Sequence, residues 1–388
     1  MTGGAMSTRV FDFRQRNLSL DILRGVAILS VVLDHADAHM IPGFVAPDGW
    51  LGAIYWGIHG WGRTGVDLFF IISGFLIGGG LLNELERKGR IELRIFWLKR
   101  VFKILPSYYT LVIVLVSLGV VDVSWRQTYI FFLFLQNYLL PTGIGPTWSL
   151  AVEEHFYLLL PLLLTAAAFF AHRRGANPVH WLPWIALCVL AVSVGMRITH
   201  AATVGVQEND FMKSHFRFDS LFFGVFCHYV WHYHGDRLRR WMHDLWLPVG
   251  FLLTLPAAFL GSNAEANFYI VYTLLSVGYA MVVLYAVERG FGRFGRHWLG
   301  QTVAAIGRWS YNIYLWQFFL LGLNPFFYAK VQLWLAEACS GLPLLALLTQ
   351  TLVAVAYSVL VGWLGTVLVE NPFMRLRKRV LARIQPRA

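Results

Sequence analysis

L-D-I-L-R-G-V-A-I-L-S-V-V-L-D-H-A, Leu20–Ala36, has the length and apolar character of a membrane-spanning helix, yet it carries four ionisable side chains. These are Asp21, Arg24, Asp34 and His35. Charged side chains are costly in hydrocarbon, and those that occur within a span usually face a protein interior, a substrate path or a binding site. The stretch therefore predicts a membrane protein that works within the membrane.

The composition of the whole chain agrees with this class. Hydrophobic residues make up 57% of the 388 residues and charged residues only 14%, and the mean hydropathy is +0.57. The net charge of +11 could suit a nucleic-acid-binding protein, but the basic residues stand in short clusters between apolar runs, as cytoplasmic loops do. We therefore expect no nucleic-acid partner. Cys188, Cys227 and Cys339 have no paired spacing, so we expect neither a disulfide framework nor a metal site.

Ten apolar runs are long enough for membrane helices, which need about 20 residues to cross roughly 30 Å of hydrocarbon. The apolar run at 129–140 is shorter and predicts a short or re-entrant helix. Ten crossings place both termini and the basic clusters in the cytoplasm, so we predict an all-α, polytopic, multi-pass protein of the inner (cytoplasmic) cell membrane. The ten runs are 18–40, 64–85, 102–121, 150–171, 181–200, 216–233, 245–261, 268–287, 303–324 and 343–369.

The runs follow one another without a linker, which predicts one membrane domain at 18–372. We expect a cytoplasmic segment at 1–17 before it and a basic cytoplasmic tail at 373–388 after it.

Arg24 and His35 lie on one face of the first predicted helix. Eleven residues turn a helix by about three turns plus 20° and raise it by about 16–17 Å. Asp21 lies near the same stripe, whereas Asp34 points about 100° away from His35. Either residue alone could be an interfacial polar side chain. Together they favour a functional face, with a cation in the cytoplasmic half and an acid/base group near the outer end.

A second basic group, K-R-V-F-K at Lys99–Lys103, opens the third predicted span at the cytoplasmic face. Lys99, Arg100 and Lys103 stand at helical i, i+1 and i+4 positions. They could bind a cytosolic anion with several phosphates, or they could only anchor the helix end.

A third group, G-P-T-W-S-L-A-V-E-E-H-F-Y at Gly145–Tyr157, begins the fourth predicted span from the outer side. Glu153 and Glu154 follow in its first turns, where carboxylates are favourable beside a helix N-terminus. Because adjacent residues point about 100° apart, at least one of them should face the bundle interior. The two roles that we consider are helix capping and a charge partner for His35.

Near the predicted outer face, four residues are candidates for binding a second substrate: Asp67, Arg217, Asp219 and Trp148. A structural salt bridge would explain Arg217 and Asp219 equally well. Trp148 suits an interfacial aromatic belt, although a sugar ring would stack on the same side chain.

Seven stretches form an ordered series along the chain. They are L-D-I-L-R-G-V-A-I-L-S-V-V-L-D-H, G-V-D-L-F-F-I-I-S-G-F-L, K-R-V-F-K-I-L-P, Q-N-Y, P-T-W-S-L-A-V-E-E-H-F-Y-L-L-L-P, I-G-R-W-S-Y-N-I-Y-L-W-Q and V-E-N-P. The series resembles the acyltransferase-3 family of integral membrane acyltransferases. The resemblance runs from about Leu18 to Pro372 and rests on the order of the motifs.

The resemblance implies a ten-helix acetyl-CoA-dependent O-acetyltransferase, which moves an acyl group from cytoplasmic acyl-coenzyme A to a hydroxyl of a glycan or other acceptor. The implied partners are acyl-CoA, a sugar or glycan acceptor and the lipid bilayer, without a metal. The family's arginine and histidine, which are separated by ten intervening residues, fall on Arg24 and His35. Its R-x-x-R pair falls on Arg100 and Lys103, where the lysine keeps the charge but loses the bidentate fork. Gln317 stands where members often have histidine, which leaves His35 as the stronger base candidate.

These expectations combine into one mechanism. The donor phosphates bind at the inner face, and His35, with a reference pKa of about 6.5, takes the proton of the acceptor hydroxyl. Glu154, with Glu153 as the second candidate, stabilises the resulting imidazolium. Direct transfer and an acyl-histidine intermediate are both open. The donor-binding cations are Arg24, Lys99, Arg100 and Lys103.

A transporter or flippase of a lipid-linked or polar substrate is the main alternative, because buried charge also suits a translocation path. The lack of an internal repeat in the sequence speaks against it.

Overall fold

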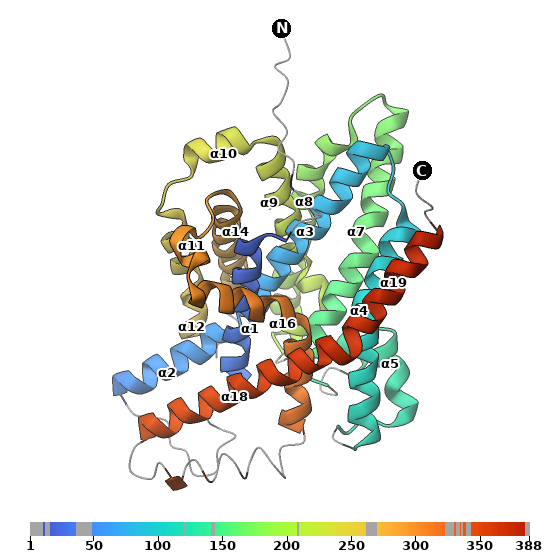
Figure 1. Ribbon diagram of the computed structural model, residues 1–388. Coiled ribbons are helices and arrows are strands. Elements are labelled where there is room, and N and C mark those ends of the chain that lie inside the picture. Colours follow the sequence, from blue (N-terminus) through green and yellow to red (C-terminus); the bar gives the residue numbers. More distant parts are fainter. Residues whose placement is uncertain are drawn as a thin grey trace.

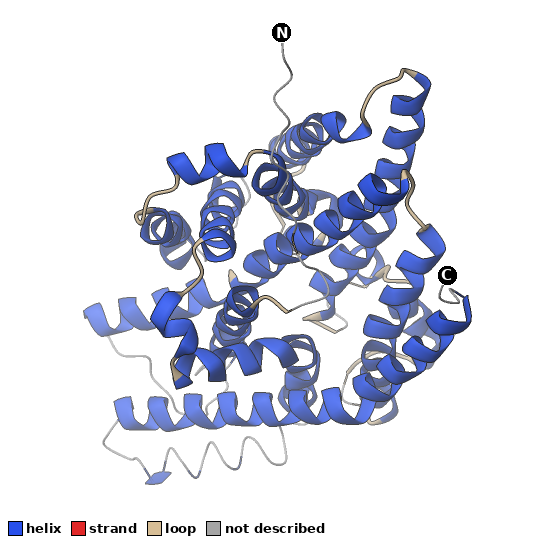
Figure 2. Cartoon of the chain, turned by 45° about the horizontal axis from the view of Figure 1, so that its top comes forward, coloured by secondary structure: helices blue, strands red, loops and turns tan. Residues whose placement is uncertain are grey.

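The computed structural model is all-helical in the residues that it describes (Figure 1; Figure 2). These residues are 11, 16–35, 49–119, 121–140, 144–207, 209–260, 270–322, 330, 334, 337–338 and 343–384. Within them no strand occurs, which confirms the all-α part of the predicted fold. Cys339 and most of the predicted segment 1–17 lie outside the described ranges.

Each predicted span coincides with one helix, or in one case with two. The helices are α1 (Leu18–His35), α3 (Gly65–Lys88), α4 (Leu93–Ser117), α7 (Thr147–Arg173), α8 (Leu182–Thr203), α9 (Phe218–Tyr233), α11 (Trp246–Thr254) with α12 (Pro256–Leu260), α14 (Tyr272–Glu288), α16 (Trp298–Gly322) and α18 (Pro343–Gly365). Shorter helices connect or extend them: α2 (Gly49–Gly62), α5 (Thr128–Phe132), α6 (Gln136–Leu139), α10 (Gly235–Trp241), α15 (Gly292–Arg296) and α19 (Asn371–Ile384).

Two short helices, α5 and α6, occupy the region where one short or re-entrant helix was predicted. Between them Phe134 has a φ of +58°, which few residues other than glycine adopt. Its ring stacks on Tyr108, with the ring centroids 4.9 Å apart. The left-handed residue ends the first helix, and burial of its ring holds the break in place.

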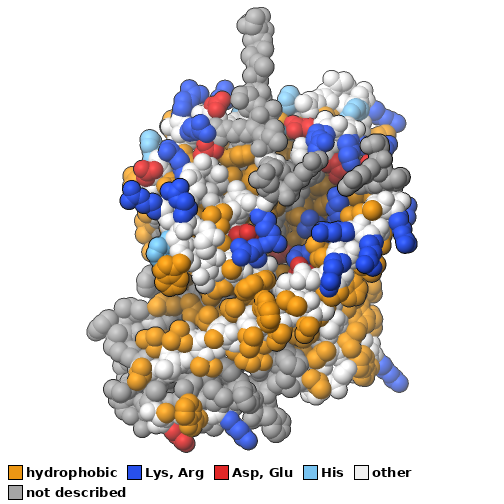
Figure 3. All heavy atoms as spheres, viewed as in Figure 1, with side chains coloured by type: hydrophobic (Ala, Val, Ile, Leu, Met, Phe, Trp, Pro, Cys, Tyr) orange, Lys and Arg blue, Asp and Glu red, His pale blue; other side chains and the backbone are white. Residues whose placement is uncertain are grey.

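Five helices of the described part are long and apolar enough to cross a membrane: Tyr55–Lys88, Leu93–Ser117, Thr147–Arg173, Pro178–Thr203 and Thr351–Ile384. This supports a multi-pass membrane protein, while ten crossings and the orientation stay predictions. Lysine and arginine side chains gather over the upper part of the molecule, and hydrophobic side chains cover the band below it (Figure 3). The upper part includes α10 and the basic helix α19 (Figure 1).

Close contact between α1 and α16 fixes the helix that carries Arg24 and His35. A Cβ on Gly307 of α16 would lie 1.9 Å from the Asp21 carbonyl oxygen, and one on Gly25 of α1 would lie 2.1 Å from the Val303 carbonyl oxygen. Small residues that allow backbones to approach are typical of helix pairs in membranes. Glycine at 25 and 307 therefore sets the distance between these two helices.

Gly307→Ala should destabilise the protein, because the added methyl group meets backbone atoms of α1 that cannot rotate away. Overpacking typically costs about 1–3 kcal/mol, so the thermal unfolding midpoint in detergent should fall. Gly80→Ala is the matched control, since a Cβ there has no described atom within 4 Å. Equal midpoints for the two variants would contradict the proposed close contact.

Candidate active site

Two cavities that share lining residues form one path from the basic surface into the bundle. We call the first the mouth, of about 340 Å³, and the second the chamber, of about 190 Å³. The shared residues come from α1, α3, α4 and α16 and are Arg24, Leu76, Arg100, Lys103 and Arg308. An anion bound in the mouth could therefore extend an uncharged part into the chamber.

The mouth is strongly cationic. The four cations predicted from the sequence to bind a phosphorylated donor lie together here, although α1 and α4 are separated by about 75 residues along the chain. Asp21 is the acidic residue in the lining, and its Oδ1 lies 3.6 Å from Arg24 Nη1. The lining cations are Arg16, Arg24, Lys99, Arg100, Lys103, Arg308 and Arg377. Such a group of cations is suited to a ligand with several negative charges.

Three of these cations, Arg16, Arg308 and Arg377, were not predicted. Arg308 lies inside the motif I-G-R-W-S-Y-N-I-Y-L-W-Q, so a signal was present in the sequence, but its direction on the helix could not be derived. Arg377 reaches the mouth because α19 lies against α4. That contact joins residues more than 250 positions apart, which no local pattern predicts.

A π-helical turn, Thr366–Glu370, joins α18 to α19 beside the mouth. The turn buries Glu370, whose carboxylate forms an ion pair with Lys103. Asn312 Nδ2 donates to Glu370 Oε2 at 2.6 Å and to Thr366 Oγ1 at 3.0 Å. Turns of this kind often occur at functional sites. Here the turn fixes α19 against the mouth and gives Lys103 a carboxylate partner.

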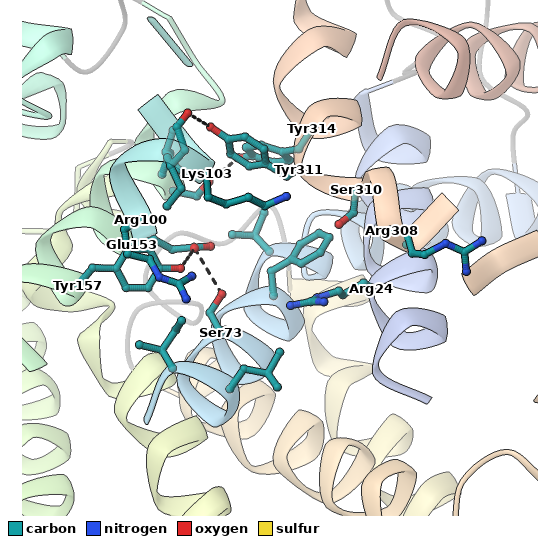
Figure 4. A pocket seen from close by; sticks show the side chains of 18 residues that line it. Arg24, Ser73, Arg100, Lys103, Glu153, Tyr157, Arg308, Ser310, Tyr311 and Tyr314 are labelled. Carbon is teal, nitrogen blue, oxygen red and sulfur yellow. Dashed lines mark hydrogen bonds between the residues drawn. The ribbon is translucent and has the colours of Figure 1, made fainter. Parts of the chain in front are cut away.

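The chamber combines apolar walls with one carboxylate. Glu153 Oε2 accepts hydrogen bonds from the Tyr157 hydroxyl and from Ser73 Oγ, the latter at 3.3 Å (Figure 4). Arg100 lies 5.6 Å from the centroid of the Tyr157 ring. The apolar part of the walls comes from Val66, Phe69, Leu76, Ile77, Ile104 and Leu150, and serine and tyrosine hydroxyl groups and the cations shared with the mouth line the rest.

At the far end of the chamber, Ser149 Oγ and the Tyr314 hydroxyl lie 2.7 Å apart. Gln317, nearly one turn further along α16, donates from Nε2 to the Tyr314 carbonyl oxygen at 3.2 Å. Its side chain also forms a hydrogen bond with His35. His35 is absent from the lining of both cavities and lies beyond the end of the chamber.

The two glutamates occupy different places. Glu153 lines the chamber, whereas Glu154 lines neither the mouth nor the chamber. The sequence therefore identified correctly that one of the pair faces an interior space. The described hydrogen bonds of Glu153 go to Tyr157 and Ser73, so it is not placed as a direct partner of His35.

The residues predicted to bind a second substrate lie in a buried charged cluster. Arg217 forms an ion pair with Asp67 and lies 5.8 Å from the Trp148 ring centroid. Arg197 Nη1, which the sequence had not singled out, lies 2.8 Å from Asp219 Oδ2. Each of the four charged residues is at most 4% exposed. The structure thus contains buried salt bridges, which were the alternative to substrate binding. Arg217 pairs with Asp67 and Asp219 pairs with Arg197, rather than with each other.

Among the described residues, no group of three His, Cys, Asp or Glu side chains could hold a metal ion. The cationic mouth and the partly apolar chamber behind it together form a basic cavity that continues into the helix bundle of a multi-pass membrane protein.

The chain belongs to the acyltransferase-3 family, whose model, described as an acyltransferase domain, matches residues 17–367. This confirms the resemblance drawn from the motifs, and with it the general class of acyltransferase. O-acetyltransferase OatA of Staphylococcus aureus strain NCTC 8325 / PS 47 is 25% identical over 343 residues, which cover 81% of this chain and 52% of the relative. OatA of strain COL gives the same values. The chain thus spans about half the length of these curated relatives, and no solved structure matches it.

Proposed function

We propose that the protein is a membrane O-acyltransferase that moves an acyl group, acetyl in the first instance, from cytoplasmic acyl-CoA to a hydroxyl of a glycan acceptor at the outer face of the cell membrane. The observation that carries the proposal is the cationic mouth leading into an apolar chamber. Relatives that are named O-acetyltransferases support the choice of acetyl. The proposal keeps ten crossings with both termini in the cytoplasm.

The donor fits this path by charge and by polarity. The phosphates of acyl-CoA bind to the cations of the mouth, and the uncharged pantetheine arm extends into the chamber. Arg24 and Arg100 line both spaces and so stand where the phosphates end and the arm begins. The thioester then lies towards the far end of the chamber, near Tyr314 and Gln317.

His35 acts as the general base in this proposal. It takes the proton of the acceptor hydroxyl while that oxygen attacks the acyl carbon, and the coenzyme A thiolate leaves. Gln317 orients the imidazole through their hydrogen bond. Glu154 and Glu153 remain the candidates for stabilising the imidazolium. Either carboxylate would act through its electrostatic field, without direct contact with His35.

The acceptor approaches His35 from the outer side. Asp67, Arg217 and Asp219 serve this side indirectly, because their ion pairs tie α3, α8 and α9 together. Trp148, beside Arg217, offers an aromatic face to a sugar ring.

Reconstitution tests the proposed reaction. Proteoliposomes with the full chain should acetylate an added glycan only when acetyl-CoA is present, and mass spectrometry of the glycan should show the added acetyl group. If the protein is instead a transporter, the substrate should cross the membrane without acyl-CoA and its mass should stay unchanged.

Arg24→Ala should weaken donor binding, because the variant removes a cation common to the mouth and the chamber. A hydrogen bond to a charged group contributes about 1.5–3 kcal/mol, so the Kd for CoA should rise roughly 10- to 100-fold. Arg87→Ala is the matched control, since Arg87 is exposed near the inner end of α3 and lines neither cavity. An unchanged Kd in Arg24→Ala would remove Arg24 from the donor site.

A further inference from the structure

Glu153 lies nearer the mouth than His35 does, and helical rise places the imidazole about 10 Å further along the path. Ser149 is four residues further towards the outer end of α7, a rise of about 6 Å, and is hydrogen-bonded to Tyr314. Gln317, the hydrogen-bond partner of His35, is three residues beyond Tyr314, a further rise of about 4.5 Å. A carboxylate at this depth cannot touch an acyl carbon that reacts at His35. It lies where the pantetheine arm of the donor would pass.

The Glu153 carboxylate has a fixed orientation and an open oxygen. The Tyr157 hydroxyl and Ser73 Oγ both donate to Oε2, and within the described residues Oε1 accepts no hydrogen bond. Figure 4 shows the carboxylate between Ser73 and Tyr157, with Arg100 close by. A carboxylate has about four acceptor positions, so further donors can bind to it.

We propose that Glu153 Oε1 accepts a hydrogen bond from a secondary amide N–H of the donor's pantetheine arm, and that Tyr157 and Ser73 hold the carboxylate in position for it. The inference rests on the proposed function, since it takes acyl-CoA as the donor. The arm is uncharged but carries amides, and an amide N–H that leaves water for the chamber costs free energy unless it finds an acceptor. Among the chamber side chains, Glu153 supplies a carboxylate at the depth of the arm.

The size of the chamber argues against a direct contact between Glu153 and the acceptor. Its volume of about 190 Å³ lies below the roughly 300–1,000 Å³ of sites for drug-sized ligands. A donor arm therefore leaves no room for a sugar in the same space. The carboxylate then acts as a binding residue that fixes how deep the thioester lies.

A comparison of two ligands distinguishes binding of the pantetheine arm from binding of the phosphates. CoA has both, whereas adenosine 3′,5′-bisphosphate has phosphates but no arm. Their Kd values would be measured on the full chain in nanodiscs, for the wild type, Glu153→Gln and Tyr157→Phe. In Glu153→Gln the amide oxygen can still accept from Ser73 and Tyr157, while an NH₂ group replaces the open oxygen.

Glu153→Gln should weaken CoA binding about 10- to 100-fold and leave bisphosphate binding within about 2-fold. Tyr157→Phe should weaken CoA binding less, and again selectively, because the carboxylate remains but is held by Ser73 alone. With acetyl-CoA as donor, the KM of Glu153→Gln should rise by a larger factor than its kcat falls.

Equal losses for both ligands would overturn the inference, because Glu153 would then support the mouth rather than the arm. Unchanged CoA binding with a collapsed kcat would also overturn it and would assign Glu153 to stabilising the imidazolium instead of binding the arm. If the wild type transfers acetyl groups and Glu153→Gln binds CoA as tightly as the wild type does, this subsite alone is disproved. A wild type that binds no CoA disproves the proposed function itself.

Discussion

His35→Ala should lower the rate of acyl transfer in proteoliposomes by roughly 10²- to 10⁴-fold, the usual contribution of a positioned general base. The Kd for CoA should stay near the wild-type value, because His35 lies beyond the chamber and lines neither cavity. The loss should therefore appear in kcat at saturating donor. Initial rates of acetyl transfer at several acetyl-CoA concentrations measure both quantities.

His180→Ala provides the control, since His180 is exposed and lines neither the mouth nor the chamber. Its rate should equal that of the wild type. Full activity in His35→Ala would eliminate the base role and leave the chamber without its proposed reaction partner. A burst of CoA release without acceptor, absent in His35→Ala, would favour the acyl-histidine route over direct transfer.

The helices could be predicted from the sequence because hydropathy reports membrane spans directly. The residues at which the helices begin and end could not be predicted in this way. The third span was predicted to begin at 102, but α4 begins at Leu93, since the basic residues before position 102 continue the same helix. The prediction also missed α2, Gly49–Gly62, because its run of 14 residues is shorter than a typical span.

The site was predicted only as far as helical geometry within one segment allows. Arg24 and Lys99–Lys103 were identified as separate basic groups, and the fold brings them together in the mouth. Contacts between side chains from distant segments could not be predicted from the sequence. Lys103 with Glu370 and Arg217 with Asp67 are 267 and 150 residues apart. For the same reason Glu154 was placed before Glu153 in the prediction from sequence, although Glu153, and not Glu154, lines the chamber.

Asp219→Ala should strongly destabilise the protein, because it leaves the buried guanidinium of Arg197 without its carboxylate. Both side chains are 1% exposed, so water cannot replace the lost partner. Removal of one member of a buried ion pair typically costs about 3–5 kcal/mol. A large fall in the thermal unfolding midpoint in detergent would be the result. A midpoint equal to that of the wild type would show that the pair contributes nothing to the fold.

The double variant Asp219→Leu/Arg197→Met should recover most of the lost stability, since an apolar pair can replace a buried ion pair without a desolvation cost. This variant separates the two roles considered for Asp219. If it is stable and transfers acetyl groups normally, the pair is structural and the acceptor does not need it. If it is stable and binds CoA but transfers no acetyl group, the charge acts on the acceptor side. The buried geometry favours the first result, because a ligand that used Asp219 would have to displace Arg197 from a contact of 2.8 Å.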